Sequence, residues 1–221
     1  MRPFWDWEWV GSNLDLVGEK IVEHLWLTFL ALAVGLAISI PLGILSYRRR
    51  RLYPPITWLA GILYTIPSLA LFALLTPFTG LTTLTAEIGL VSYTLLILIR
   101  NIVSGLMTVP EDVKEAARGM GLTERQILWR VELPMALPVV VAGIRIASVT
   151  TVGLVTVTVF VGKGGLGYLI LNGFRPLLPD IAVLVGLGLS LLLAMALDGA
   201  LLGGQRLLTP WARTARPRAA T

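Results

Sequence analysis

The stretch that decides the fold is Thr108–Pro134, TVPEDVKEAARGMGLTERQILWRVELP, a charged segment between two long apolar runs. The whole chain has 221 residues, of which 56% are hydrophobic and only 14% are charged. A soluble domain normally carries roughly 25% charged residues. The sequence therefore predicts an integral membrane protein, and this segment is a water-facing connection between two of its spans.

A first short helix is predicted at the start of this segment. Residues 108–111 (TVPE) have the form of a capping box, with proline in the first turn where it is tolerated. A small-residue apolar face follows at helical spacing, formed by Val113, Ala116, Ala117 and Met120. Gly121 stands just past the expected end of the helix, where a left-handed backbone favours glycine.

A second short helix is predicted to follow the glycine corner. Residues 123–126 (TERQ) form another capping box, and Pro134 is expected to end the helix. Helices that lie on a lipid surface favour bulky apolar residues, whereas the alanines and glycines here suit close approach to a protein. The helix pair is predicted to dock a protein partner, with an interfacial pair on the lipid surface as the alternative.

Apolar stretches around this segment predict the spans, because a helix needs about 20 apolar residues to cross the hydrocarbon core. Pro77 and Gly80 indicate an external turn after the second span, and Pro67 falls in the middle of that span. Such breaks are tolerated where neighbouring helices or a water-filled cavity satisfy the freed backbone groups. The spans are expected at residues 25–47, 56–76, 86–107, 136–162 and 181–202.

The basic residues predict the orientation. Five spans that start outside place three segments in the cytoplasm: the run RRRR at 48–51, the segment 108–135 and the C-terminal tail. These hold twelve arginines and lysines, against four in the outer segments. Cytoplasmic segments carry the excess of positive charge. The predicted fold class is an all-α membrane protein with its N-terminus outside, its C-terminus in the cytoplasm and a cytoplasmic helix pair.

Three parts of the chain follow from this topology. Residues 1–24 form an external or interfacial segment, in which Trp5, Trp7 and Trp9 suit the membrane–water boundary. The alternative is a flexible N-terminal tail. Residues 25–205 form one transmembrane domain, with the cytoplasmic loop 108–135 inside it. Residues 206–221 form a basic cytoplasmic tail.

Several kinds of chemistry are excluded. There is no cysteine and a single histidine, His24, which is expected at the membrane interface, so neither a metal site nor a cofactor is predicted. The net charge of +5 is too diffuse for nucleic-acid binding. The glycine cluster 162–167 lacks the strand and acid of a dinucleotide site and is expected to be a flexible turn. Glu87 and Asp198 lie near span ends, and Asp198 is expected to pair with a basic residue such as Arg206.

The same segment resembles a known family. Permease subunits of ABC importers, found in the bacterial inner membrane, carry E-A-A, three residues, G, nine residues, then I-x-L-P in the cytoplasm. This chain matches with Glu115-Ala116-Ala117, Gly121 and Val131-Glu132-Leu133-Pro134, with valine in place of isoleucine. The resemblance implies that Glu115, Ala116, Ala117, Gly121, Val131, Leu133 and Pro134 couple the chain to an ATPase.

The resemblance also implies partners and a place of action. A multi-pass permease of the cell inner membrane would work with a pair of ABC ATPase subunits, a second permease copy or a paralogue, and an external substrate-binding protein. The chain itself would not be an enzyme. Within the family it looks most like the osmoprotectant branch, on YTIPSLALF at 64–72, VKEAARGMG at 113–121 and VGKGGLG at 161–167.

The expected solute is a small quaternary amine such as glycine betaine, choline or carnitine. Aromatic faces bind such a cation through cation–π contacts, so the pathway is expected to offer aromatic side chains rather than carboxylates. The alternatives are an ABC permease for another small solute such as an amino acid, an ion-coupled secondary transporter, and a scaffold without transport. The predicted pathway residues are Tyr64, Thr65, Pro67, Ser68, Phe72 and Tyr93.

Overall fold

The computed structural model describes residues 6–175 and 177–210 of the chain. All regular structure in these residues is helical, as predicted. The predictions for Trp5 and for the tail beyond residue 210 lie outside the described residues. The elements are α1 (Trp7–Ser12), α2 (Leu14–Arg48), η1 (Arg50–Leu52), α3 (Tyr53–Thr65), α4 (Ser68–Thr79), α5 (Thr83–Met107), α6 (Glu111–Gly119), α7 (Glu124–Ile127), η2 (Leu128–Glu132), α8 (Leu133–Val155), η3 (Thr156–Val161), α9 (Gly167–Phe174) and α10 (Ile181–Leu208).

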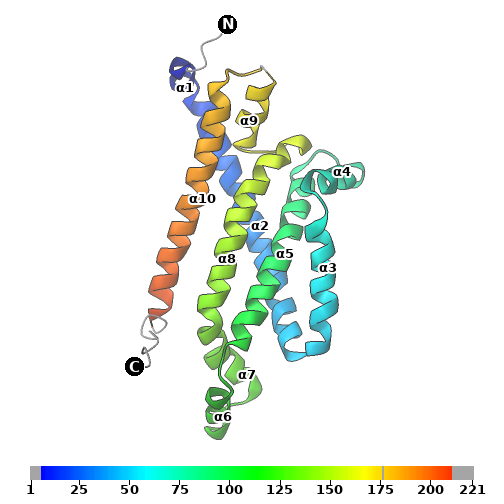
Figure 1. Cartoon of the computed structure of the whole chain (residues 1–221), viewed down its shortest axis with the longest axis vertical. Coiled ribbons are helices and arrows are strands. Elements are labelled where there is room, and N and C mark those ends of the chain that lie inside the picture. Colours follow the sequence, from blue (N-terminus) through cyan, green and yellow to red (C-terminus); the bar gives the residue numbers. More distant parts are fainter. Residues whose placement is uncertain (1–5, 176, 211–221) are drawn as a thin grey trace, which may run out of the picture.

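Long helices run up and down the molecule and form its body (Figure 1). Within the described residues, four helices are long and apolar enough to cross a membrane, or five spans if the bent pair α3–α4 counts as one. The turn between α2 and α3, the helices α6 and α7, and the C-terminal end of α10 all lie toward one end of the bundle (Figure 1). These are the three segments predicted to be cytoplasmic, so we call this end the cytoplasmic end.

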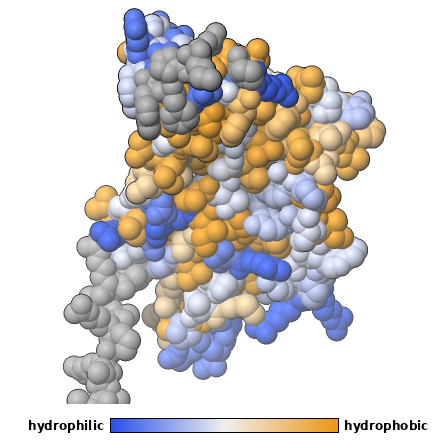
Figure 2. All heavy atoms as spheres, turned by 45° about the horizontal axis from the view of Figure 1, so that its top comes forward, coloured by the Kyte–Doolittle hydropathy of each residue, from blue (hydrophilic) through white to orange (hydrophobic). Residues whose placement is uncertain are grey.

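The surface agrees with a membrane setting. Apolar side chains cover much of the face shown in Figure 2, and hydrophilic side chains gather at its lower end. Several of the largest apolar side chains are exposed, among them Trp58 at 70% and Phe78 at 82%. In a membrane protein such side chains face lipid, because lipid tails are as apolar as they are.

The second span is broken rather than continuous. A single helix over 56–76 was predicted, but α3 ends at Thr65 and α4 starts at Ser68 with a bend of 95°. Pro67 disfavours helical geometry at Ile66, whose ψ is 127°. The carbonyl of Ile66 accepts a hydrogen bond from the Tyr93 hydroxyl of α5, which satisfies a backbone group freed by the break.

Helix α5 is the centre of the bundle, and it packs closely against α2 on one side and α8 on the other. Glycines allow this approach. A Cβ atom on Gly35 of α2 would lie 2.2 Å from the Thr94 hydroxyl oxygen, and one on Gly143 of α8 would lie 2.3 Å from the Asn101 Cβ. Gly143 thus serves close helix packing, whereas a Cβ atom on Gly153 of the same helix would meet nothing within 4 Å.

The first and fourth spans both start at an earlier residue than predicted. Helix α2 begins at Leu14, so much of the predicted external segment is already helical. Pro134 does not end a helix: α7, η2, α8 and η3 form one continuous stretch, Glu124–Val161, that is long and apolar enough to cross a membrane. A π-helical turn at Leu128–Glu132 precedes the proline, and such a turn relaxes the tight backbone spacing into which a proline ring would otherwise intrude.

His24 is a buried structural residue, not the interfacial one predicted. Its side chain is fully buried, its Nε2 lies 3.0 Å from the Val152 carbonyl, and its Nδ1 accepts a hydrogen bond from the backbone N–H of Leu166. Gly165, with φ +48°, packs directly against the backbone of His24. The glycine-rich turn is therefore held against α2 and α8.

Asp198 of α10 pairs with Arg145 of α8, where a partner such as Arg206 was predicted. The guanidinium donates from Nε to Oδ1 at 2.8 Å and from Nη2 to Oδ2 at 2.7 Å. This two-point geometry is the strongest that an arginine and a carboxylate form. The pair fixes the register of α10 against α8.

Candidate functional site

The candidate site is the corner at the cytoplasmic end where α6 meets α7 (Figure 1). Gly121 turns the chain there with φ +83°, a left-handed conformation, as predicted. Its N–H donates to the Arg118 carbonyl at 2.9 Å, and the Leu122 N–H donates to the Ala117 carbonyl at 3.2 Å. These bonds satisfy carbonyls at the end of α6, so the corner is a closed turn rather than a loose loop.

Only one of the two predicted capping boxes forms. In the second box, the Thr123 hydroxyl accepts from the Gln126 N–H and the Gln126 amide oxygen accepts from the Thr123 N–H at 2.8 Å. The first box is wrong: α6 has Pro110 at its N-cap and no side-chain cap. The Thr108 hydroxyl instead donates to the Gly105 carbonyl, because α5 continues to Met107 and leaves that carbonyl within reach at 2.6 Å.

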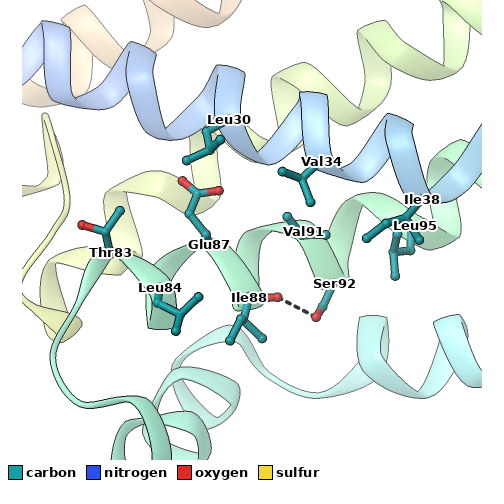
Figure 3. A pocket seen from close by; sticks show the side chains of 10 residues that line it. All are labelled: Leu30, Val34, Ile38, Thr83, Leu84, Glu87, Ile88, Val91, Ser92 and Leu95. Atoms are coloured by element: carbon teal, nitrogen blue, oxygen red, sulfur yellow. Dashed lines mark hydrogen bonds between the residues drawn. The ribbon is translucent and has the colours of Figure 1, made fainter.

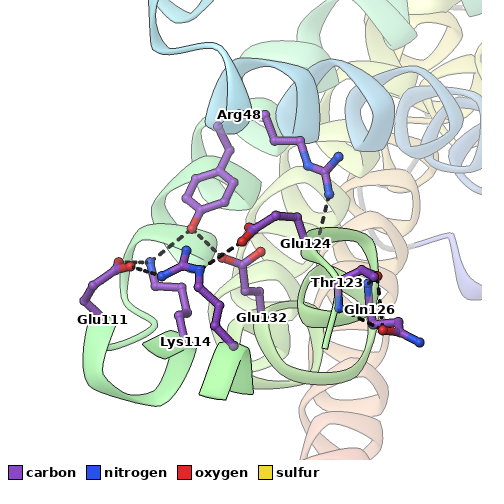
Figure 4. Close-up of polar contacts among 9 residues, drawn as sticks. Arg48, Glu111, Lys114, Thr123, Glu124, Gln126 and Glu132 are labelled. Atoms are coloured by element: carbon purple, nitrogen blue, oxygen red, sulfur yellow. Dashed lines mark hydrogen bonds and ion pairs between the residues drawn. The ribbon is translucent and has the colours of Figure 1, made fainter. Parts of the chain in front are cut away.

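Ion pairs hold α6 onto α7 (Figure 4). Glu111 binds Lys114 at 2.6 Å and Arg118 at 3.0 Å, and Arg118 also binds Glu124 at the start of α7 at 2.9 Å. Hydrogen bonds from Lys114 and then from Arg118 lower the pKa of Glu111, and the hydrogen bond to Glu111 raises the pKa of Lys114. Single surface pairs contribute little, but a network with a shared arginine fixes orientation.

The corner is also tied to the long helices. The Tyr47 hydroxyl at the end of α2 donates to the buried carboxylate of Glu132 at 2.6 Å, and Lys114 lies 3.4 Å from the same hydroxyl. Arg48 donates to the Glu124 carbonyl at 3.3 Å. A cavity of about 350 Å³ lies among these side chains. Movement of the corner must therefore be shared with α2 and with the start of α8.

The predicted apolar face of α6 is divided between the bundle and the solvent. Ala117 is buried at 1% exposure and Val113 is half-buried, but Ala116 is exposed and Met120 is 73% exposed. The inward positions are taken by Lys114 and Ala117 because the ion pairs pull that side of α6 onto the bundle. The exposed outer face consists of Asp112, Glu115, Ala116, Gly119 and Met120.

The motif residues predicted from the family pattern thus divide into two groups. Glu115, Ala116 and Gly121 are exposed at the tip, whereas Ala117 is buried under it. The remaining three lie in η2 and the first turn of α8 and are half-buried: Val131, Leu133 and Pro134. The structure brings the two groups to one end of the molecule, within a single turn and the helix that follows it.

Sequence reasoning missed the polar contacts that anchor the corner. Tyr47 and Glu132 are 85 residues apart, and no pattern pairs them in advance. Two signals were present: a tyrosine directly before the arginine run, and an acid inside an otherwise apolar stretch at Val131–Pro134. An acid at the start of a span needs a partner, and the Tyr47 hydroxyl at the end of α2 is that partner.

The predicted pathway residues lie on both sides of the break in the second span. The rings of Tyr64 and Tyr93 meet edge to face with centroids 5.9 Å apart. Tyr64 is 39% exposed, while Tyr93 is buried and donates to the Ile66 carbonyl. Phe72 is fully buried in the core cluster with Leu27.

The other three pathway candidates are small or polar residues at the break itself. Pro67 is exposed and Ser68 is half-buried. The hydroxyl of Thr65 donates to the Ile62 carbonyl at 2.9 Å, within its own helix. The positions of these six residues do not establish a role in the pathway. Their pathway role stays a prediction.

Comparison with known proteins places these features in a family. The model of the family described as "Binding-protein-dependent transport system inner membrane component" matches residues 22–204. The osmoprotectant import permease protein OsmW of Salmonella typhimurium is 41% identical over 90% of this chain and 94% of its own. The carnitine transport permease protein OpuCB of Listeria monocytogenes is 37% identical, over 85% of this chain and 86% of its own.

A third relative and a solved structure agree with this. The choline transport system permease protein OpuBB of Bacillus subtilis is 32% identical over 86% of this chain and 88% of its own. A structure of the MetNI methionine ABC transporter in an inward-facing conformation superposes with a TM-score of 0.81 at 26% identity, over 90% of this chain and 98% of that one. The chain therefore belongs to the inner-membrane components of binding-protein-dependent transport systems, and it is a multi-pass permease subunit of an ABC importer.

Proposed function

We propose that this permease imports small quaternary amines of the compatible-solute type, such as glycine betaine, choline or carnitine. The observation that carries the proposal is the set of relatives named for osmoprotectant, carnitine and choline transport, at 41%, 37% and 32% identity. The methionine transporter shares the fold at 26% identity, so an amino-acid permease is the second candidate.

Uptake by the reconstituted importer distinguishes the two candidates. Radiolabelled choline is offered to proteoliposomes that contain the permease, its ATPase and the external binding protein, and unlabelled glycine betaine, carnitine or methionine is added in excess. Competition by betaine and carnitine but not by methionine is the expected result. Competition by methionine alone, or direct uptake of methionine without uptake of choline, would favour the amino-acid permease.

The α6–α7 corner docks the ATPase subunits, which hydrolyse ATP outside this chain. The exposed outer face of α6 supports this, because it stands on a closed turn at the cytoplasmic end and offers small residues for close approach. Glu115, Ala116 and Gly121 contact the ATPase in this scheme, and Ala117 packs the helix onto the bundle. The complete importer contains two ATPase subunits, two permease copies or this chain with a paralogue, and a binding protein outside.

Movement passes from the corner into the membrane along α7, η2 and α8. These elements form one uninterrupted helical stretch, so Val131, Leu133 and Pro134 transmit a shift of the corner without a loop in between. Closure of the ATPase pair on ATP then rocks the permease halves between outward-facing and inward-facing states. The family match over residues 22–204 supports the division into an external segment 1–24, a permease domain 25–205 and a tail 206–221.

The break at Pro67 lies on the solute pathway in this proposal. An interrupted helix exposes backbone groups only where they line a cavity or contact protein, and Tyr64, Thr65, Pro67, Ser68 and the core residues Phe72 and Tyr93 surround this one. Tyr64→Ala removes an exposed aromatic face and is expected to slow choline uptake. Tyr93→Phe keeps its ring but removes the bond to Ile66, and is expected to lower thermal stability instead. Unchanged uptake in Tyr64→Ala would exclude this residue.

A further inference from the structure

A groove runs along the outer half of the bundle between α2 and α5 and encloses a cavity of about 620 Å³ (Figure 3). Its walls are two apolar stripes at helical spacing, one from α2 and one from α5. The stripe of α2 consists of Leu30, Val34 and Ile38, and that of α5 includes Leu84, Ile88 and Leu95. One acidic side chain, Glu87, lies among them.

The carboxylate of Glu87 is buried without a partner. Its side chain projects from α5 toward α2 beside Leu30 (Figure 3). Glu87 is 8% exposed, and neither carboxylate oxygen has a hydrogen-bond partner among the described residues. Two hydroxyl-bearing residues also line the groove, Thr83 and Ser92, and the Ser92 hydroxyl donates to the Ile88 carbonyl at 2.6 Å.

An acid at this depth argues that the groove faces the inside of the assembled transporter. Acidic side chains in membrane spans almost always face a bundle interior or a water-filled cavity and pair with another group. Lipid would leave the Glu87 carboxylate unpaired among apolar side chains. The α2–α5 face is therefore an inner face of the importer, and the partner of Glu87 comes from outside this chain.

The surroundings of Glu87 select among possible partners. A metal ion needs several oxygen ligands, but no group of three or more metal-binding side chains occurs in the described part of the chain. A primary ammonium group has three N–H donors, for which one carboxylate is a poor match. A quaternary ammonium group has no N–H at all. It needs one compensating charge and apolar contact for its methyl groups, and this groove provides both.

We propose that Glu87 contacts the quaternary ammonium group of the solute. The solute then passes between the α2–α5 face of this chain and the second permease subunit. This inference rests on the proposed function and names a residue for it. It departs from the expectation that the pathway offers only aromatic faces. The apolar stripes contact the methyl groups, and the carboxylate balances the charge that would otherwise be stranded at membrane depth.

The test is Glu87→Gln in the complete importer, reconstituted with its ATPase and binding protein. The substitution keeps the shape of the side chain and removes its charge. The initial rate of choline uptake is expected to fall about tenfold, equivalent to about 1.4 kcal/mol. Glu87→Asp is expected to retain more uptake than Glu87→Gln. Glu8→Gln, an exposed acid on α1, is the matched control and is expected to leave uptake unchanged.

Thermal stability separates a solute contact from a structural role. Removing a buried, unpaired charge is expected to leave the melting temperature of the complex unchanged or higher, although uptake falls. If Glu87 instead pairs with a basic group of the second permease, Glu87→Gln would lower the melting temperature or dissociate the complex, and the inference is wrong. Equal uptake by wild type and Glu87→Gln also refutes it. A wild-type importer that moves no quaternary amine refutes the proposed function as well.

Discussion

The sharpest prediction concerns the glycine that turns the corner. Gly121 has φ +83°, and a Cβ atom added there meets nothing within 4 Å. Gly121→Ala therefore introduces no clash, and its whole effect is the conformational cost of a left-handed residue, about 1–2 kcal/mol. Gly61, in α3 and outside the corner, has equally open surroundings and ordinary helical geometry, so Gly61→Ala is the matched control.

The consequence for docking follows from the bonds at the turn. If residue 121 relaxes to an ordinary backbone, the bonds to the Arg118 and Ala117 carbonyls are lost and α6 swings away from α7. The ATPase must then restore the corner when it binds, and this conformational cost comes out of the binding free energy. The affinity of the ATPase for the permease is expected to fall about 5–30-fold. Gly61→Ala is expected to bind as tightly as wild type, because it adds a helix-favouring alanine away from the corner.

The assay is the dissociation constant of purified ATPase for the permease in nanodiscs, measured by surface plasmon resonance at equal loading of each variant. Weaker binding by Gly121→Ala than by Gly61→Ala is the expected result. Equal dissociation constants for the two variants, with hydrogen exchange showing α6 released from α7 in Gly121→Ala, would refute the claim that this corner docks the ATPase.

Three further predictions concern charge and packing. The pKa of Glu111 is lowered from its ordinary value near 4.5, so its ion pairs persist at pH values above 4.5 and are lost as the pH falls through the lowered pKa. Hydrogen exchange of α6 should therefore accelerate only in acid, and Glu111→Gln should abolish this acceleration. Asp198→Asn leaves Arg145 without its carboxylate partner and should lower the melting temperature, which the double variant Arg145→Leu, Asp198→Leu restores. Gly35→Ala should cost about 1–3 kcal/mol in the same measurement because its Cβ meets Thr94, whereas Gly61→Ala, with open surroundings, should not. Each prediction is contradicted if its variant behaves as wild type.

The long spans and the glycine corner could be predicted because both follow from local rules. A run of about 20 apolar residues has few alternatives to a membrane helix, and a glycine after a capped helix favours a left-handed turn. Pro67 correctly indicated a disturbance in the second span. Its 95° bend was not predicted, because the Tyr93 hydroxyl that donates to the freed Ile66 carbonyl belongs to another helix.

The errors at the site have the same origin. Thr108 matches a capping box, but the continuation of α5 offers its hydroxyl a nearer carbonyl. Pro134 usually ends a helix, yet the π-helical turn before it lets the helix continue into α8. Periodicity placed Val113, Ala116, Ala117 and Met120 on one face, but Ala117 is buried against the bundle whereas Ala116 and Met120 are exposed. Local patterns cannot weigh contacts between distant segments.

The measurement that tests the account most directly is ATP-dependent uptake of choline and glycine betaine into proteoliposomes. The importer is assembled from this permease, its ATPase and its binding protein, and the permease alone is placed under a sodium or proton gradient for comparison. Uptake that needs all three components and ATP is the predicted result. Uptake by the permease alone, driven by the ion gradient without an ATPase, would contradict the account.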